Sequence, residues 1–231
     1  MGHFHEHRFP GESEDYRAAR DELLTAEIDL RRRVEAVAER RRGLPPGGKA
    51  DDYVFQEGAA DLSDQETVSE TKLSELFQDG KTSLALYSFM FPPDGRACPM
   101  CTAFLDGLNG SAQHIGARVN LAVVAKAPIG TIRDWARQRD WKNLRLLSSG
   151  ANSYNRDYLA ESPDGAQWPL MNVFRKAGGT VHHTYGTEMF YAPAETGQHP
   201  RHVDMLWPLW NVFDLTPDGR GTDWFPQVSY D

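Results

Sequence analysis

Cysteine is scarce in this sequence: there are two among 231 residues, Cys98 and Cys101, with two positions between them. A disulfide framework that stabilises a fold spreads its cysteines so that each bridge closes a long loop. A bridge across two intervening residues closes almost no loop and therefore adds little stability. The pair is better explained by reactivity or by metal binding.

Long apolar runs and a net positive charge are absent as well. No segment approaches the roughly 20 apolar residues of a membrane-spanning helix, and the first residues lack the regions of a secretory signal. The 33 acidic and 25 basic residues give a formal net charge of −8, which repels phosphate backbones and anionic lipid. We therefore expect a cytoplasmic protein whose partners include neither nucleic acid nor membrane.

Apolar residues are still numerous enough for a core, because 40% of the chain is hydrophobic. The length allows one large domain or two small ones. Residues 1–13, with His3, His5 and His7, indicate a flexible lead. Residues 14–48 predict a long helix over 14–42 and a linker rich in glycine and proline. Residues 49–231 then form the main domain.

The main domain alternates between short strands and helices. We expect strands at 53–55, 82–91, 118–125, 144–147, 170–175 and 180–185, and helices at 69–78, 101–117, 129–141 and 201–215, the last interrupted or kinked at Pro208. This order predicts an α/β fold with a central mixed sheet, one antiparallel edge and flanking helices. The long N-terminal helix is an extension. It and the tryptophan-rich C-terminal helix are the two candidate contacts for a homo-oligomer.

The cysteine pair follows a predicted buried strand and begins a predicted helix. At such a position the backbone N–H groups and the helix dipole favour a thiolate on Cys98. Pro99 suits the first helical turn, and Cys101 lies one turn further on. A pair with this spacing can form and break a disulfide with little backbone motion.

The main functional hypothesis is therefore a thiol–disulfide oxidoreductase, with Cys98 as nucleophile and Cys101 as resolving thiol. It would act on a thiol or disulfide substrate and be restored by a cellular thiol reductant. The reaction would need no cofactor besides the redox-active disulfide of this pair.

Two alternatives stay open. In the first, Cys98, Cys101, His182 and His183 hold copper or zinc, since thiolates and imidazoles suit both metals. There is no second CxxC, however, and the histidines lack the spacing of a zinc finger. In the second alternative the chain is a non-catalytic binding module, and Cys98→Ser would leave its function intact.

The Cys-Pro-Met-Cys pair, together with Trp168-Pro169 directly before the predicted strand at 170–175, resembles the thioredoxin superfamily. The resemblance implies that Pro169 is a cis-proline that faces the cysteines and holds the partner's backbone. It also implies that Trp168, Pro99 and Met100 contact the substrate.

Further segments, from about residue 15 to the C-terminus, resemble one bacterial thioredoxin-like family of unknown function. They lie at 16–24, 89–92, 98–101, 183–187 and 214–220. Members of that family are predicted dithiol–disulfide oxidoreductases.

One departure from related enzymes concerns peroxide chemistry. Peroxiredoxins carry the pattern Pro-X-X-X-Thr/Ser-X-X-Cys. Counting back from Cys98, the hydroxyl position holds Gly95 and the proline position holds Phe91. The hydroxyl that would polarise a peroxide is missing, which argues against a peroxiredoxin mechanism.

Overall fold

The structure is a computed structural model that describes residues 4–78, 80–196 and 201–230. The chain forms two compact units, Met1–Pro45 and Pro46–Asp231. The first three residues of the expected lead, His3 among them, lie outside the described residues. No helix within the described ranges is both long enough and apolar enough to cross a membrane.

The first unit is built on helix α1 (Glu14–Arg42), which has the bounds that the sequence predicts. Ser13 caps it by accepting a hydrogen bond from the Tyr16 N–H, and acidic residues in the first turn and basic residues in the last turn suit the helix dipole. The preceding residues lie against the start of the helix, where Glu12 forms an ion pair with Arg20 at 3.2 Å.

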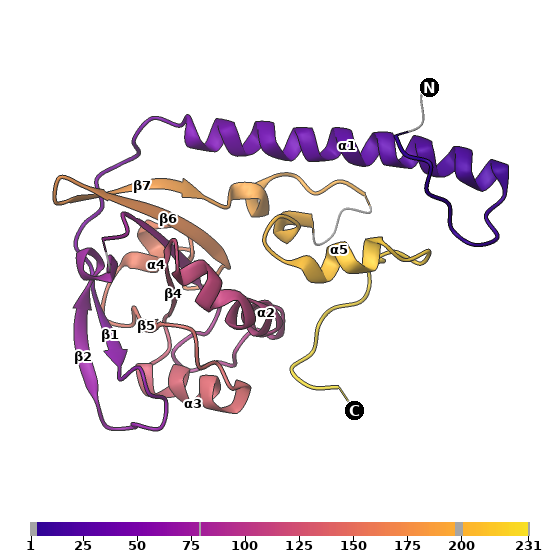
Figure 1. The fold of residues 1–231 in the computed structure, drawn as a ribbon. Coiled ribbons are helices and arrows are strands. Elements are labelled where there is room, and N and C mark those ends of the chain that lie inside the picture. The colour runs from indigo at the N-terminus through magenta and orange to yellow at the C-terminus, as the bar shows by residue number, and fades with distance from the viewer. Residues whose placement is uncertain (1–3, 79, 197–200, 231) are drawn as a thin grey trace. The chain divides into compact units, whose positions relative to one another are not determined.

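The second unit contains one seven-stranded mixed sheet in the order β2-β1-β5-β4-β3-β6-β7 (Figure 1). Strands β3, β4 and β5 are parallel, and the remaining pairs are antiparallel. The strands are β1 (Val54–Gly58), β2 (Val68–Lys72), β3 (Ser83–Ser88), β4 (Asn120–Ala125), β5 (Leu146–Ser148), β6 (Leu170–Ala177) and β7 (Thr180–Gly186). This is the expected α/β, thioredoxin-like arrangement.

The helical elements lie between and after these strands. They are the α-helices α2 (Pro99–Gly116), α3 (Ile129–Arg139), α4 (Tyr154–Asp157) and α5 (Pro208–Asp214), and the 3₁₀ turns η1 (Leu73–Leu76), η2 (Glu188–Tyr191) and η3 (Arg201–Val203). Helices α2 and α3 lie side by side (Figure 1), joined by Asp106, which accepts hydrogen bonds from Arg139 and from Trp141.

Side chains alternate between the two faces of the central strands, as the pleat requires. On one face Leu84 and Leu86 of β3 pack with Phe174. On the other face Tyr87 and the following Phe89 pack with residues of α2 and α3 and with the tryptophans of the C-terminal segment. The sheet is therefore buried on both faces, which explains why the central strands read as nearly continuous apolar runs.

The helix predicted at 69–78 is wrong. Residues 68–72 form strand β2, paired with β1 from Val54 opposite Lys72 to Gly58 opposite Val68, and a 3₁₀ turn follows. Pairing with β1 decides the outcome, because strand formation depends on neighbouring strands more than on intrinsic preference. Leu73 and Leu76, the two apolar residues that suggested a helix, lie on the 3₁₀ turn, and their side chains are buried.

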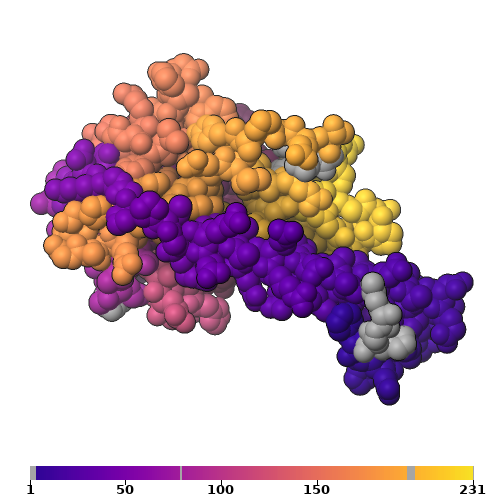
Figure 2. Space-filling model, turned by 90° about the horizontal axis from the view of Figure 1, so that it is seen from above, coloured from indigo at the N-terminus to yellow at the C-terminus, as the bar shows by residue number. Residues whose placement is uncertain are grey.

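The helix predicted at 201–215 is interrupted before Pro208, and only its second part is an α-helix. The structure has the short turn η3 and then α5, and Pro208 is the first residue of α5. A residue before proline is driven out of the helical region, and Trp207 is accordingly extended. Figure 2 shows this C-terminal segment, in yellow, against the orange segment that follows β7. Phe190 and His202 form a ring contact between the two segments.

The end of the expected linker pairs with the sheet edge. The His183 N–H donates to the Gly48 carbonyl at 3.0 Å, and the Ala50 N–H donates to the Val181 carbonyl at 2.9 Å. Gly47 approaches β7 so closely that a Cβ there would lie 2.2 Å from the His183 carbonyl oxygen. This segment covers part of the β7 edge, which would otherwise present unpaired backbone groups.

Candidate functional site

The cysteine pair lies just beyond the carboxyl end of β3, where ligands of open α/β sheets commonly bind. A loop leads from β3 to Cys98, whose N–H donates to the Met90 carbonyl at 3.0 Å. Cys98 is the N-cap residue of α2 and Pro99 occupies the first turn, as predicted. Both thiols are free; Cys98 is half-buried and Cys101 is buried.

The two thiols have opposite proton affinities. The Cys101 thiol donates a hydrogen bond to the Cys98 sulfur, and the backbone N–H groups of Cys101 and Met100 add to it, so the pKa of Cys98 falls to about 6 although burial opposes the shift. That same bond to Cys98, followed by burial, raises the pKa of Cys101 well above its usual value. At neutral pH the pair therefore consists of a thiolate at Cys98 and a thiol at Cys101.

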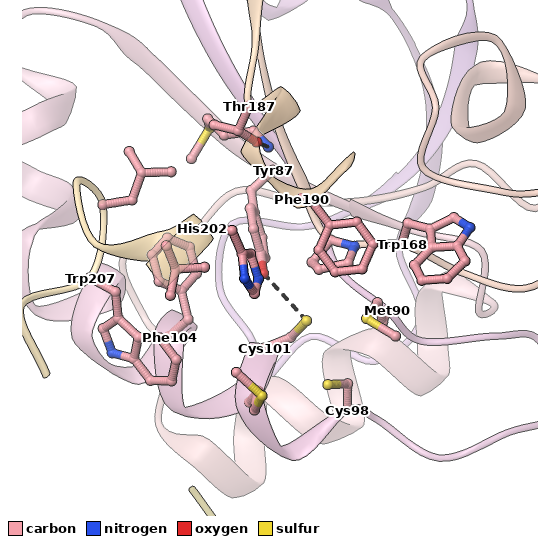
Figure 3. A pocket seen from close by; sticks show the side chains of 15 residues that line it. Tyr87, Met90, Cys98, Cys101, Phe104, Trp168, Thr187, Phe190, His202 and Trp207 are labelled. Atoms are coloured by element: carbon pink, nitrogen blue, oxygen red, sulfur yellow. Dashed lines mark hydrogen bonds between the residues drawn. The ribbon is translucent and has the colours of Figure 1, made fainter. Parts of the chain in front are cut away.

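Tyr87 on β3 is a third member of this cluster. Its hydroxyl donates to the Cys101 sulfur across 3.3 Å (Figure 3). Burial, and then the charge that Cys101 carries once it is ionised, raise the pKa of Tyr87, which keeps the hydroxyl protonated as a donor. This contact is one of those that lower the pKa of Cys101 and so oppose the larger effects that raise it.

The sheet register brings Pro169 to the cysteines. Strand β6 runs antiparallel to β3 with Leu170 opposite Ser88, so the residue before Leu170 lies beside the loop that leads to Cys98. Here a cavity of about 230 Å³ opens. Of the predicted site residues, it brings together Cys98, Cys101, Met100, Trp168 and Pro169. Pro99, the first residue of α2, is exposed and does not line the cavity.

Most of the cavity wall was not foreseen from the sequence. The additional lining residues are Tyr87, Met90, Phe104, Met171, Thr187, Phe190, His202, Val203, Leu206 and Trp207. The alternation of side chains along the predicted strand at 82–91 is a signal that could have placed Tyr87 on one face with Phe89 and Phe91. The wall residues that follow β7 could not be placed in this way, because their position depends on how the later segments pack; they are Thr187, Phe190, His202, Val203, Leu206 and Trp207.

Aromatic contacts connect these walls. The Trp168 and Phe190 ring centroids are 5.0 Å apart, and the Phe190 and His202 centroids are 5.1 Å apart. On the other side, the Tyr87 and Phe104 centroids lie 4.7 Å apart. Figure 3 shows Met90 between Cys98 and the Phe190–Trp168 pair. Packed rings of this kind give the cavity a defined shape.

The two histidines of the alternative metal site have other contacts. His182 Nδ1 lies 3.2 Å from the Gly47 carbonyl, and His183 Nε2 lies 2.9 Å from the Asn172 side-chain oxygen. Neither lines the cavity beside the cysteines. Across the described ranges, no group of three or more His, Cys, Asp or Glu side chains is arranged to hold a metal ion.

The loop before Cys98 has no space at Gly95 for the side-chain hydroxyl that peroxiredoxins carry at this position. A Cβ on Gly95 would lie 2.3 Å from the Pro92 ring. A serine or threonine at this position would therefore collide with the ring. Phe91, at the position of the peroxiredoxin proline, is buried in the core.

Comparison with family models places residues 6–230 in the group described as "Bacterial protein of unknown function (DUF899)". The chain belongs to this family. The matched range includes the cysteine pair and Trp168-Pro169. A search of curated proteins finds no match.

Among solved structures, similar chains include peroxiredoxins. The reduced 2-Cys peroxiredoxin of Plasmodium vivax is 16% identical, covers 69% of this chain and 94% of its own, and has a TM-score of 0.48. The reduced Prx3 of Vibrio vulnificus is 16% identical, with 66% and 90% covered and a TM-score of 0.46. Thioredoxin peroxidase I of Plasmodium yoelii is 17% identical, with 78% and 99% covered and a TM-score of 0.46. No statement about the reaction follows from these similarities.

Proposed function

We propose that this protein is a dithiol–disulfide oxidoreductase in which Cys98 is the nucleophile and Cys101 the resolving thiol. The observation that carries the proposal is the placement of the pair: half-buried Cys98 is the N-cap residue of α2, and buried Cys101 lies one turn on. The hydrogen bond from Cys101 and the N–H groups of the helix start lower the pKa of Cys98, and the same bond raises that of Cys101. Thiolate is the reactive form of cysteine, and a half-buried Cys98 at a cavity wall is accessible to a substrate.

The proposed reaction consists of two successive thiol–disulfide exchanges. The Cys98 thiolate attacks one sulfur of a substrate disulfide, the substrate S–S bond breaks, and the departing thiolate takes up a proton. Cys101 then loses its proton and attacks the Cys98 sulfur, which releases the second substrate thiol. The substrate gains two electrons and two protons, and the protein is left with the Cys98–Cys101 disulfide. A cellular dithiol or thiol reductant would reverse that oxidation in the cytoplasm, the compartment expected from the sequence.

The test is a redox titration of the purified protein across a glutathione series, with mass spectrometry of the peptide that contains both cysteines. We expect a disulfide that forms reversibly and is lost in Cys98→Ser and Cys101→Ser. Titration before and after chelator treatment separates the metal alternative: thiols that stay blocked until metal is removed would contradict the proposal. Free thiols that never pair would contradict it as well.

A further inference from the structure

We propose that the substrate of this dithiol is a small, uncharged, apolar disulfide, or the thiol made from it, rather than a charged low-molecular-weight disulfide or a protein. This inference rests on the proposed function and adds the substrate class. It is carried by the chemistry of the cavity wall that adjoins Cys98.

Apart from the Cys98 thiolate, the wall offers no charged partner for a substrate. Among the described residues that line the cavity, none is Lys, Arg, Asp or Glu. The polar side chains there are few: the Tyr87 hydroxyl donates to Cys101, the Thr187 hydroxyl accepts from the Met171 N–H, and the His202 ring packs against Phe190. A carboxylate that enters loses its hydration without gaining a counter-charge, and an ammonium group meets only the Cys98 thiolate, the group that has to attack the disulfide; both losses of hydration are unfavourable.

The size of the cavity favours a small molecule. A volume of about 230 Å³ is below the roughly 300–1,000 Å³ typical of sites for drug-sized ligands. The cavity extends inward from Cys98 to side chains that are themselves buried, including Phe104, Met171 and Trp207. A peptide that followed this path would bury N–H and carbonyl groups without partners. Short apolar arms on a disulfide meet mostly carbon and sulfur atoms.

The position of the apolar surface suits attack by Cys98. Met90, Trp168 and Phe190 line the same cavity as Cys98, and Met90 lies between Cys98 and the Phe190–Trp168 pair (Figure 3). One arm of the substrate would pack there while its sulfur meets the Cys98 thiolate. The bond that breaks and the bond that forms are those of the proposed reaction, so no further oxidant or reductant is required.

The inference can be tested with four disulfides that differ in charge: diethyl disulfide, cystamine, bis(carboxyethyl) disulfide and glutathione disulfide. Each is mixed with the Cys101→Ser protein, and mass spectrometry follows the mixed disulfide on Cys98. Each rate is divided by the rate of the same disulfide with the urea-unfolded protein, which removes differences in intrinsic reactivity. The ionic strength is held at about 0.15 M, where the Debye length is about 8 Å.

We expect the normalised rate for diethyl disulfide to exceed that of both small charged disulfides by at least about tenfold, and glutathione disulfide to be slower still. The net charge of the chain, −8, would by itself make the cation cystamine fastest. Equal rates, or a fastest reaction with cystamine or glutathione disulfide, would overturn the inference.

Leu206→Lys, with Met205→Lys as its matched control, tests the wall directly. Leu206 lines the cavity and is 40% exposed, whereas Met205 is 59% exposed and lies outside the lining. A cation at 206 should raise the rate for bis(carboxyethyl) disulfide relative to diethyl disulfide, and a cation at 205 should leave that ratio unchanged. An equal response of both variants would indicate long-range attraction and contradict the inference.

The two levels of the proposal fail in different ways. If the wild-type protein forms its internal disulfide reversibly but shows no preference among the four disulfides, the substrate class is wrong and the oxidoreductase stands. If none of the four reacts and no internal disulfide forms, the proposed function itself fails.

Discussion

At the scale of single residues, the chemistry depends on three groups whose proton affinities are set by one another. Cys98 is a better thiolate because Cys101 donates to it, and Cys101 is a poorer one for the same reason. Tyr87 adds a second donor on the far side of Cys101. Removal of any one group should therefore change the proton affinities of the other two.

Reaction of Cys98 with iodoacetamide should rise with pH through an inflection near 6, because the thiolate is the reactive form and its pKa is about 6. Below that pH the sulfur is protonated and the rate falls. Cys101→Ala removes the largest contribution to the lowered pKa, so its inflection should move upward, toward the ordinary thiol value of about 8.5. Mass spectrometry across pH 4–10 measures both, and an inflection that stays near 6 in Cys101→Ala would contradict the assignment.

Tyr87→Phe should slow the resolving step without slowing the first attack. The Tyr87 hydroxyl helps to lower the pKa of Cys101, so its loss makes the resolving thiolate rarer. A hydrogen bond worth about 1 kcal/mol corresponds to a rate change of roughly fivefold. Rapid quenching with acid should show the mixed disulfide on Cys98 persisting longer than in the wild type. Equal lifetimes, with unchanged far-ultraviolet circular dichroism, would show that the tyrosine has no part in resolution.

At the scale of elements, single side chains hold segments far apart in sequence. Arg133 of α3 is buried and donates to the carbonyls of Ala59, of Asp61 at 2.8 Å and of Asp64 at 2.6 Å, in the connection between β1 and β2. A Cβ on Gly58 would lie 2.5 Å from the Arg133 side chain. A side chain at position 58 would therefore displace this arginine from the carbonyls that it binds.

Arg133→Ala should lower the free energy of unfolding by about 2 kcal/mol, because hydrogen bonds from a charged group to buried acceptors are lost. Arg133→Lys should restore only part of that loss, since an ammonium lacks the planar fork that reaches several carbonyls. Arg156→Ala is a suitable control: its side chain is 63% exposed and lies 3.9 Å from Glu161, so we expect a change within about 0.5 kcal/mol. Urea denaturation measures all three, and equal losses in Arg133→Ala and Arg156→Ala would refute this role.

Helix α1 carries exposed apolar residues at a spacing of seven: Tyr16, Leu23, Leu30 and Val37. A stripe with this repeat is typical of helices that pair with another helix. The expected homo-oligomer contact through this helix predicts that Leu23→Glu combined with Leu30→Glu lowers the mass measured by light scattering. Glu22→Gln combined with Asp29→Asn, also exposed positions seven apart, should leave the mass unchanged. A wild-type protein of monomer mass would rule out the contact.

At the scale of the whole molecule, the proposed chemistry belongs to one of the two units. The sheet, the cysteine pair and the cavity all belong to Pro46–Asp231. A chain of residues 46–231 should therefore fold, unfold cooperatively, and keep both the iodoacetamide inflection near pH 6 and the reversible disulfide. If it folds but its inflection moves, the first unit contributes to the site and this division is wrong.

The placement of the dithiol could be predicted from the sequence because its causes are local. A buried apolar strand, a turn, and a proline after Cys98 determine that the thiol begins a helix. The groups that lower its pKa, the Cys101 thiol first and then the N–H groups of Cys101 and Met100, belong to the next three residues of the chain. The bounds of α1 follow in the same way from Ser13 and Gly43 at its ends. The parallel core strands were recognisable because burial on both faces leaves long apolar runs.

The cavity and the edge of the sheet depended on contacts between distant residues. Residues 68–72 became a strand because β1 lies beside them, although Leu73 and Leu76 suggested a helix. Phe190, His202 and Leu206 reached the cysteines because the chain after β7 folds back over β3 and β6. The reactive sulfur was thus determined by neighbours in the sequence. The apolar wall that selects its substrate arises from long-range packing, which no local pattern encodes.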